Sequence, residues 1–367
     1  MWYRKITTNK TLLRKVKVVM KKTKLEAIKS MDLDKRLFLA NQTADEETLC
    51  ILATDTREEV RQFVALNENT PTKALSDLAR DKSWRVRSAV GINKNTKAET
   101  LAMLACDKEA WIRWTVARNE NTPKEALAVL ANDIDWQVRK AVVSNKNAPE
   151  EVLSNFAKDE YIVVRCAVAE NRSTPADVLA VLAKDEVYEV RKAVATNRNT
   201  SADVLAMLAR NKEWWVRMSV ARNENTPKEA LAVLAQDEDG RVRSAVAGNI
   251  NTPIELLSVL AQDKHWLVRQ TVAKNENTPK ETLAVLADDC DLGVRQNVAG
   301  NKNMPKEALV KLAGDRDYGV RKAVVNNPNT SYNTLLMLSK VKAVEIREKA
   351  KEVLKERALK ANTNKER

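Results

Sequence analysis

NENTPKEALAVLAQDEDGRVRSAVAG, residues 223–248, is one copy of a unit that repeats along almost the whole 367-residue chain. Asparagine and arginine each recur in it with an unbroken step of 26 residues, which is typical of tandem-repeat proteins. The asparagine column is Asn41, Asn67, Asn93, Asn119, Asn145, Asn171, Asn197, Asn223, Asn249, Asn275, Asn301 and Asn327. The arginine column is Arg61, Arg87, Arg113, Arg139, Arg165, Arg191, Arg217, Arg243, Arg269, Arg295, Arg321 and Arg347. The period therefore predicts about twelve stacked units of one kind.

Each unit carries two helix signatures. The first helix is expected to open with a capping box and a proline at its first position, as in TPKE at residues 122–125. Leucines three residues apart, such as Leu127 and Leu130 or Leu231 and Leu234, predict a buried stripe along it. An aspartate then ends the helix.

The second helix runs from that aspartate to the next asparagine and has the pattern V-R-x-A-V-A-x-N. Valine and alanine at helical spacing, such as Val138, Ala141 and Val142, are expected to be buried. Because 26 residues hold two helices and two turns, one helix of each pair must be very short, either α or 3₁₀. Such a unit cannot bury its own apolar stripe, so it must stack on its neighbours. The predicted fold class is an all-α solenoid of two-helix repeats.

Columns shared by all the repeats predict structural roles, because a residue present in every unit serves a need that every unit has. The aspartates (Asp107, Asp133) and arginines (Arg113) are expected to pair within or between units as a ladder of charges. The asparagines are expected either to cap the second helix in a left-handed conformation or to bridge turns. The acid at the third helical position, such as Glu125, is interpreted as a cap and not as a catalyst.

The unit resembles the leucine-rich repeat variant family, which shares the pattern N-x-N-T-P-x-E-x-L-x-x-L-A-x-D…V-R-x-A-V-A-x-N. It is more distantly similar to HEAT repeats, which share the Asp…Val-Arg signature. The resemblance covers roughly residues 37–350 and implies α-helices alternating with short helices in a right-handed superhelix. The founding type of the family has a cysteine cluster with an iron–sulfur centre before its repeats. Residues 1–40 contain no cysteine, so this feature is not carried over.

Cysteine and histidine usage argues against a metal or cofactor site. The single histidine, His265, precedes Trp266 and is expected to lie exposed in a loop. The four cysteines are widely spaced and form no CxxC pair, which favours a reducing cytoplasm over a disulfide framework. No apolar run approaches the roughly 18 residues of a membrane span, and the basic N-terminal stretch does not read as a signal peptide. We therefore expect a cytoplasmic, monomeric protein without cofactor, metal or membrane span.

Function is expected in the columns that vary between repeats. In the second helix these are the two positions before the Val-Arg pair, the position after it, and the position before the asparagine. The first, third and fourth of these positions are spaced i, i+4, i+8 and share a helix face, and the remaining position is adjacent to it. A helical solenoid lines its concave side with one helix of each unit, so we expect this face to form an inner groove.

These variable columns collect aromatic and basic side chains, including seven of the eight tryptophans. The aromatic members are Trp84, Trp111, Trp114, Trp136, Trp214, Trp215, Trp266, Tyr188 and Tyr318. The charged members are Arg85, Arg118, Lys140, Lys192, Arg222, Arg241, Lys274 and Lys322, against Glu170 and Glu189. Aromatic residues and arginine are enriched in binding hot spots. The alternative for the column of Trp84, Trp136, Trp214 and Trp266 is packing between repeats.

The net charge of +13 lies at the two ends of the chain. Residues 1–40 hold 12 Lys/Arg and 3 Asp/Glu, residues 341–367 hold 9 and 5, and the remainder is neutral. We expect residues 1–40 to form a basic extension, its stretch 33–40 a degenerate second helix that caps the array. Residues 41–340 are expected to form the solenoid. In residues 341–367 we expect a cap helix, with the last stretch, NTNKER, disordered.

Three functions fit these patterns. The leading hypothesis is a non-enzymatic scaffold that recognises a protein or peptide, acidic in character, through the aromatic and basic groove. The alternative is nucleic-acid binding, with indoles stacking on bases and Lys/Arg neutralising phosphates. A DNA glycosylase similar to HEAT-like enzymes is the third, but every candidate aspartate belongs to a repeated column. No Ser/His/Asp or Cys/His set and no phosphate-binding glycine loop is present in the sequence.

Overall fold

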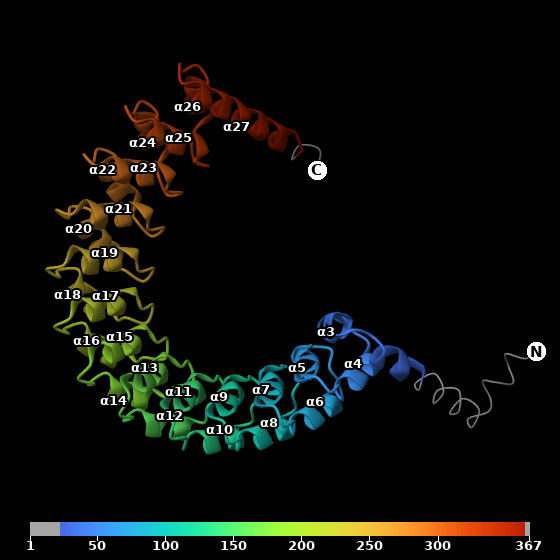
Figure 1. Cartoon of the computed structure of the whole chain (residues 1–367). Helices are drawn as coiled ribbons and strands as arrows, with labels where there is room; N and C mark the ends of the chain where they lie inside the picture. Colours follow the sequence, from blue (N-terminus) through green and yellow to red (C-terminus); the bar gives the residue numbers. More distant parts are fainter. Residues whose placement is uncertain (1–22, 364–367) are drawn as a thin grey trace, which may run out of the picture. The chain divides into compact units, whose positions relative to one another are not determined.

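The computed structural model describes residues 23–363, and its regular structure in this range consists of α-helices (Figure 1). Contacts divide the chain into two compact units, residues 1–178 and 179–367. In both units a seven-residue helix alternates with a nine-residue helix, so the predicted all-α tandem repeat is confirmed. Within the described residues the short helices are α-helical, and the 3₁₀ alternative is not adopted.

The first unit opens with α3 (Leu33–Gln42). Its seven-residue helices are α4 (Glu46–Leu52), α6 (Thr72–Leu78), α8 (Ala98–Leu104), α10 (Lys124–Leu130) and α12 (Glu150–Phe156). Its nine-residue helices are α5 (Glu58–Leu66), α7 (Trp84–Ile92), α9 (Ala110–Arg118), α11 (Trp136–Ser144) and α13 (Ile162–Glu170). The division between the units falls within α14 (Ala176–Leu182).

The second unit follows the same order and ends with the 20-residue helix α27 (Val344–Thr363). Its seven-residue helices are α16 (Ala202–Leu208), α18 (Lys228–Leu234), α20 (Ile254–Leu260), α22 (Lys280–Leu286), α24 (Lys306–Leu312) and α26 (Tyr332–Leu338). Its nine-residue helices are α15 (Tyr188–Thr196), α17 (Trp214–Arg222), α19 (Gly240–Gly248), α21 (Trp266–Lys274), α23 (Leu292–Gly300) and α25 (Tyr318–Asn326).

The core of each unit lies between its two rows of helices. Leu127 and Leu130 of α10 and Val138, Ala141 and Val142 of α11 are buried, as their spacing predicted. Consecutive nine-residue helices pack directly against each other, whereas consecutive seven-residue helices touch far less. Within each unit the nine-residue helices therefore form the inner row of the curve, and the seven-residue helices form the outer row (Figure 1).

The charge ladder forms between repeats. Most arginines of the column donate from Nε to the aspartate 20 residues later, at 2.5 to 2.8 Å, and from Nη1 to the carbonyl six residues before them, as Arg113 does with Asp133 and Asp107. Pairs of this kind are Arg61–Asp81, Arg87–Asp107, Arg113–Asp133, Arg139–Asp159, Arg217–Asp237, Arg243–Asp263, Arg269–Asp289 and Arg295–Asp315. The guanidinium thus joins two successive turns, and both partners are largely buried.

The asparagine column bridges turns, and its left-handed alternative is wrong. The capping asparagines have extended backbones, for example φ −71° and ψ 128° at Asn327, and no non-glycine residue of the described range has a positive φ. Nδ2 of Asn301 donates to the carbonyls of Ala273 and Asn275 in the preceding repeat, at 2.8 and 3.0 Å. Its Oδ1 accepts from the backbone N–H of Asn303. The amide therefore satisfies two helix-end carbonyls that have no partner within their own helix.

The predicted capping box is wrong at the Thr-Pro sites. Thr122 is buried, and its Oγ1 donates to the carbonyl of Val116, 2.5 Å away, instead of accepting from the helix that follows. Pro123 occupies the N-cap itself, without a side-chain cap. The tight turn places the hydroxyl over the end of the preceding nine-residue helix, where unpaired carbonyls need donors. True hydroxyl caps occur where serine replaces proline, at Ser201 and Ser331.

The two ends differ from the repeats between them. Helix α3 covers residues 33–40, where a degenerate second helix was expected, and its Arg36 pairs with Asp55 at 2.5 Å. Residues 23–29 are helical, and residues 1–22 of the expected basic extension lie outside the described residues. Helix α27 continues to Thr363, so the first two residues of the tail predicted to be disordered are helical, and residues 364–367 lie outside the described range. Between residues 23 and 363 no helix has both the length and the apolar character that a bilayer crossing needs.

Candidate binding site

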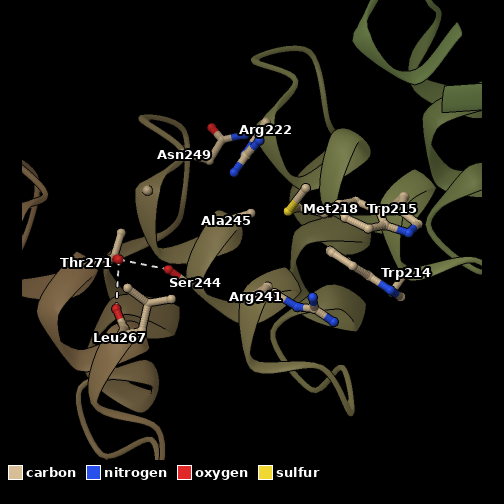
Figure 2. Close-up of a pocket in the computed structure, with 11 residues that line it drawn as sticks. Trp214, Trp215, Met218, Arg222, Arg241, Ser244, Ala245, Asn249, Leu267 and Thr271 are labelled. Atoms are coloured by element: carbon tan, nitrogen blue, oxygen red, sulfur yellow. Dashed lines mark hydrogen bonds between the residues drawn. The ribbon is translucent and has the colours of Figure 1, made fainter. Parts of the chain in front are cut away.

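In each unit a hollow lies on the row of nine-residue helices. The α9–α11 hollow of the first unit has a volume of 400 Å³. It is lined by Trp111, Trp114, Arg118, Trp136, Gln137, Lys140, Ala141 and Ser144. The α17–α19 hollow of the second unit has a volume of 530 Å³ (Figure 2). It is lined by Trp214, Trp215, Met218, Arg222, Arg241, Ser244, Ala245, Gly248, Asn249, Leu267 and Thr271.

Two stacked indoles form one wall of the α9–α11 hollow. Trp111 and Trp114 lie one helical turn apart on α9, with ring centroids 4.5 Å apart. The guanidinium carbon of Arg118 lies 4.6 Å from the Trp114 ring, within the range of a cation–π contact. Trp111 is 52 % exposed although Trp114 beneath it is half-buried. The wall therefore presents an indole face and a positive charge to solvent together.

The α17–α19 hollow has a similar wall. Trp214 and Trp215 stack with their centroids 3.5 Å apart, and the Arg241 guanidinium of the next helix lies 3.3 Å from the Trp214 ring. Arg241 also pairs with Asp239 at 2.6 Å. This hydrogen-bonded pair raises the pKa of Arg241 and lowers the pKa of Asp239. Figure 2 shows Arg222 and Arg241 toward opposite ends of the hollow, with Met218 between them on the α17 side.

Small side chains on the second helix of each hollow leave the space open. Ala141 and Ser144 of α11 correspond to Ala245 and Gly248 of α19, at the sixth and ninth helix positions. A Cβ at Gly248 would approach Cγ2 of Thr271 to 3.3 Å, so this glycine keeps the second hollow wide. These small residues were not among the predicted site residues, because aromatic and charged side chains alone were taken as marks of binding. The signal that could have found them is a small residue opposite a tryptophan.

The hollows are positively charged. None of their lining residues is acidic. Arg118, Lys140 and Arg222 are exposed, and within residues 23–363 none of the three forms an ion pair. An exposed cation beside an apolar wall can bind a group that combines an anion with an apolar or aromatic part.

The structure brings together about half of the predicted site residues. Nine of them line a hollow: Trp111, Trp114, Arg118, Trp136, Lys140, Trp214, Trp215, Arg222 and Arg241. Lys192 lies 6.0 Å from the Trp215 ring, beside the second hollow. The hollows use the first, second, fifth and ninth helix positions, so the second position belongs to the same surface as the other three.

The other predicted residues lie elsewhere in the two units. Arg85 contacts the Trp84 ring at 5.0 Å and pairs with Glu58 at 3.2 Å. In the second unit, the exposed Trp266 stacks on His265, and Lys274 is exposed at the end of the same helix. The remaining three are two exposed tyrosines and one exposed lysine on α15 and α25: Tyr188, Tyr318 and Lys322.

Hydrogen bonds to carboxylates mark the two tyrosines. Tyr318 donates to Glu345, which raises the pKa of its phenol. The pKa of Tyr188 is raised by its hydrogen bond with Glu189. Packing between repeats was the alternative interpretation of one tryptophan column. In this column Trp84 and Trp266 are exposed, and Trp136 and Trp214 are half-buried. Water therefore reaches all four of these indoles.

The residues considered for metal binding are scattered. Among residues 23–363 no three His, Cys, Asp or Glu side chains lie close enough together to hold a metal ion. His265 is exposed as predicted and caps α21, with its Nδ1 accepting from the backbone N–H of Leu267 at 3.2 Å.

Comparison with known proteins agrees with the repeat pattern. Residues 214–239, which contain α17 and α18, match the model of the leucine rich repeat variant family. The predicted resemblance to that family is thus confirmed in this repeat. No curated protein matches the sequence.

Two solved structures are similar to the chain. One is described as a leucine-rich repeat variant with a novel repetitive protein structural motif. It is 26 % identical, with 61 % of this chain and 88 % of that chain covered and a TM-score of 0.48. The other, an engineered protein, is 19 % identical, with 91 % and 95 % covered and a TM-score of 0.23.

Proposed function

We propose that the protein is a non-enzymatic binding scaffold that recognises a protein or peptide through its nine-residue helices. A tandem-repeat solenoid is a scaffold fold, which supports binding in general and leaves the partner open. One observation carries the proposal. The residues that differ between repeats supply the indoles and basic side chains of both hollows, and two of these arginines, Arg118 and Arg222, form no ion pair within residues 23–363.

A catalytic role has little support in the arrangement of acidic residues. The buried aspartates are held by the arginines of the ladder, for example Asp237 by Arg217, and lie at the turns and not in the hollows. An acid engaged in this way is not available as a general base. The separate cysteines fit our proposal of a cytoplasmic protein.

A binding screen with matched variants tests the proposal. We expect members of an arrayed library of short peptides to bind the whole chain. Replacing Trp111, Trp114 and Trp215 together by Ala should weaken this binding at least about tenfold, because aromatic anchors dominate such interfaces. The melting temperature, followed by circular dichroism, should move much less than the loss of a buried indole would require. The control replaces three exposed valines of the outer row by Ala: Val233, Val259 and Val285.

Two results would contradict this function. Failure of every peptide, together with oligonucleotide binding that weakens steeply from about 50 to about 200 mM salt, would make the protein a nucleic-acid binder. A large fall in melting temperature for the triple variant would assign the indoles to packing.

A further inference from the structure

We infer that the scaffold has two equivalent pockets, one in each compact unit, and that each takes an acidic peptide segment with one apolar or aromatic anchor residue. The inference rests on the proposed function and specifies its partner. Its starting observation is that the two hollows occupy the same register of the repeat. Trp111 and Arg118 correspond to Trp215 and Arg222, four repeat lengths of 26 residues later.

The equivalence extends across both helices of each hollow. The helix ends WIRWTVARN (residues 111–119) and WVRMSVARN (residues 215–223) share six of nine residues, including the tryptophan and both arginines. On the facing helices, Ala141 corresponds to Ala245. Each hollow lies wholly within one unit. Each pocket is therefore complete in its own unit.

The other repeats do not reproduce this combination. Of the nine-residue helices in the described chain, only α9 and α17 have tryptophan at the second position and arginine at the ninth. Glu170 stands at the ninth position of α13, and Glu189 stands at the second position of α15. These acids would repel an anionic ligand. The acidic positions between the two hollows in the sequence therefore favour two discrete sites over one continuous basic groove.

Charge complementarity selects an acidic ligand. Arg118, Lys140 and Arg222 form no ion pair within residues 23–363, and the lining residues include no acid. The apolar part of each pocket selects the anchor residue. Trp215, Met218 and Leu267 surround the second hollow, whose 530 Å³ can admit an aromatic side chain. A carboxylate can then reach the arginine at the end of the helix while the anchor rests against the indole.

The small number of basic side chains in each hollow favours a peptide ligand over a nucleic acid. Each hollow is lined by two basic residues, Arg118 and Lys140 in the first and Arg222 and Arg241 in the second. Asp239 already neutralises Arg241. Sequence-independent strand binding instead relies on a positive groove that follows many phosphates.

Isothermal titration calorimetry on the whole chain tests the inference. The probe is an N-acetylated, C-amidated peptide of Asp, Glu and Gly residues with one central Phe. We expect two peptides to bind per chain. Arg118→Glu and Arg222→Glu should each remove one of them, and the double variant should bind at least about tenfold more weakly at both sites.

The matched controls are Arg80→Glu and Arg210→Glu. Both arginines are exposed in the turn that follows a seven-residue helix, one in each unit, and neither lines a hollow. These variants should still bind two peptides, as should the wild-type chain. A probe with Ala in place of Phe should bind more weakly to both sites, because it lacks the anchor.

The outcomes separate the inference from the proposed function. Binding of one peptide per chain, lost in only one of the two arginine variants, would overturn the two-pocket inference and keep the scaffold. Binding of library peptides but not of the acidic probe would overturn the assigned chemistry. Failure of all peptides would overturn the proposed function itself. Circular dichroism of each variant confirms that a lost site does not reflect unfolding.

Discussion

Position 211 carries asparagine where the neighbouring repeats carry an aspartate. Arg191 would pair with a carboxylate there, as Arg217 does with Asp237. Instead Nε of Arg191 is buried without a hydrogen-bond partner, although its Nη1 still donates to the carbonyls of Asp185 and Glu186. A buried donor without a partner costs about 1 to 3 kcal/mol. The stability of the second unit is therefore lower at this position than at its other ladder positions.

Asn211→Asp should stabilise the protein by about 1 to 2 kcal/mol, because it supplies the carboxylate that Arg191 lacks. The free energy of unfolding, measured by urea denaturation at pH 7, checks this. The reciprocal control, Asp237→Asn, creates the same defect at Arg217 and should destabilise by about 2 kcal/mol. If Asn211→Asp left stability unchanged or reduced it, the ladder would not contribute at this position.

The repeated residues predicted the Arg–Asp ladder, but they did not predict the role of every side chain in the turns. The repeated columns indicated that Arg, Asp and Asn are structural, because a role that the repeats share leaves a 26-residue period. The column of threonines was misassigned, since Thr-Pro-x-Glu has the same letters whether the hydroxyl caps the following helix or the preceding one. Only the direction of the chain at Thr122 decides between these, and tertiary packing sets that direction.

At the scale of the helix, the end of α21 depends on an amide from the next repeat. Asn301 satisfies the carbonyls of Ala273 and Asn275 and accepts from Asn303, all at a buried site. Asn301→Ala should therefore cost about 2 to 4 kcal/mol, because it leaves buried carbonyls unpaired. Urea denaturation followed by circular dichroism measures this cost.

Asn303→Ala is the matched control for that variant. Like Asn301, Asn303 is an asparagine whose Nδ2 donates to a carbonyl of the preceding repeat, that of Glu276. This contact is exposed, so water can replace it. The cost of Asn303→Ala should stay below about 1 kcal/mol. Equal losses in the two variants would show that burial of the amide does not decide its contribution.

The binding surface was predictable only in part at this scale. Variable columns of one helix identified the tryptophans and arginines, because departures from a repeat are visible in the sequence. The hollows, however, form between two consecutive helices, and their depth depends on the small residues Ala141, Ala245 and Gly248. The 26-residue period does not reveal which positions of one nine-residue helix face which positions of the next nine-residue helix. The offset between neighbouring helices sets that register.

At the scale of the whole molecule, the ladder makes stability depend on pH in both units. Burial alone would raise the pKa of Asp133, but hydrogen bonds from Arg113 and from the backbone N–H of Asp135 outweigh it, so the pKa lies below the ordinary 3.8. The same balance lowers the pKa of five further ladder aspartates: Asp81, Asp107, Asp263, Asp289 and Asp315. Three of these six aspartates lie in each unit.

A carboxyl whose pKa is lower in the folded than in the unfolded state stabilises the fold above its unfolded pKa, and this contribution is lost as pH falls through the folded pKa. Above about pH 5, these carboxyl groups should leave the free energy of unfolding nearly unchanged. Below about pH 4, they should make it fall increasingly steeply as the pH drops. Urea denaturation at a series of pH values measures this dependence. Asp263→Asn removes one titrating group, so the variant should be less stable at neutral pH and lose less stability on acidification. An acid dependence as steep as that of the wild type would mean that the pair of Asp263 with Arg243 does not couple protonation to folding.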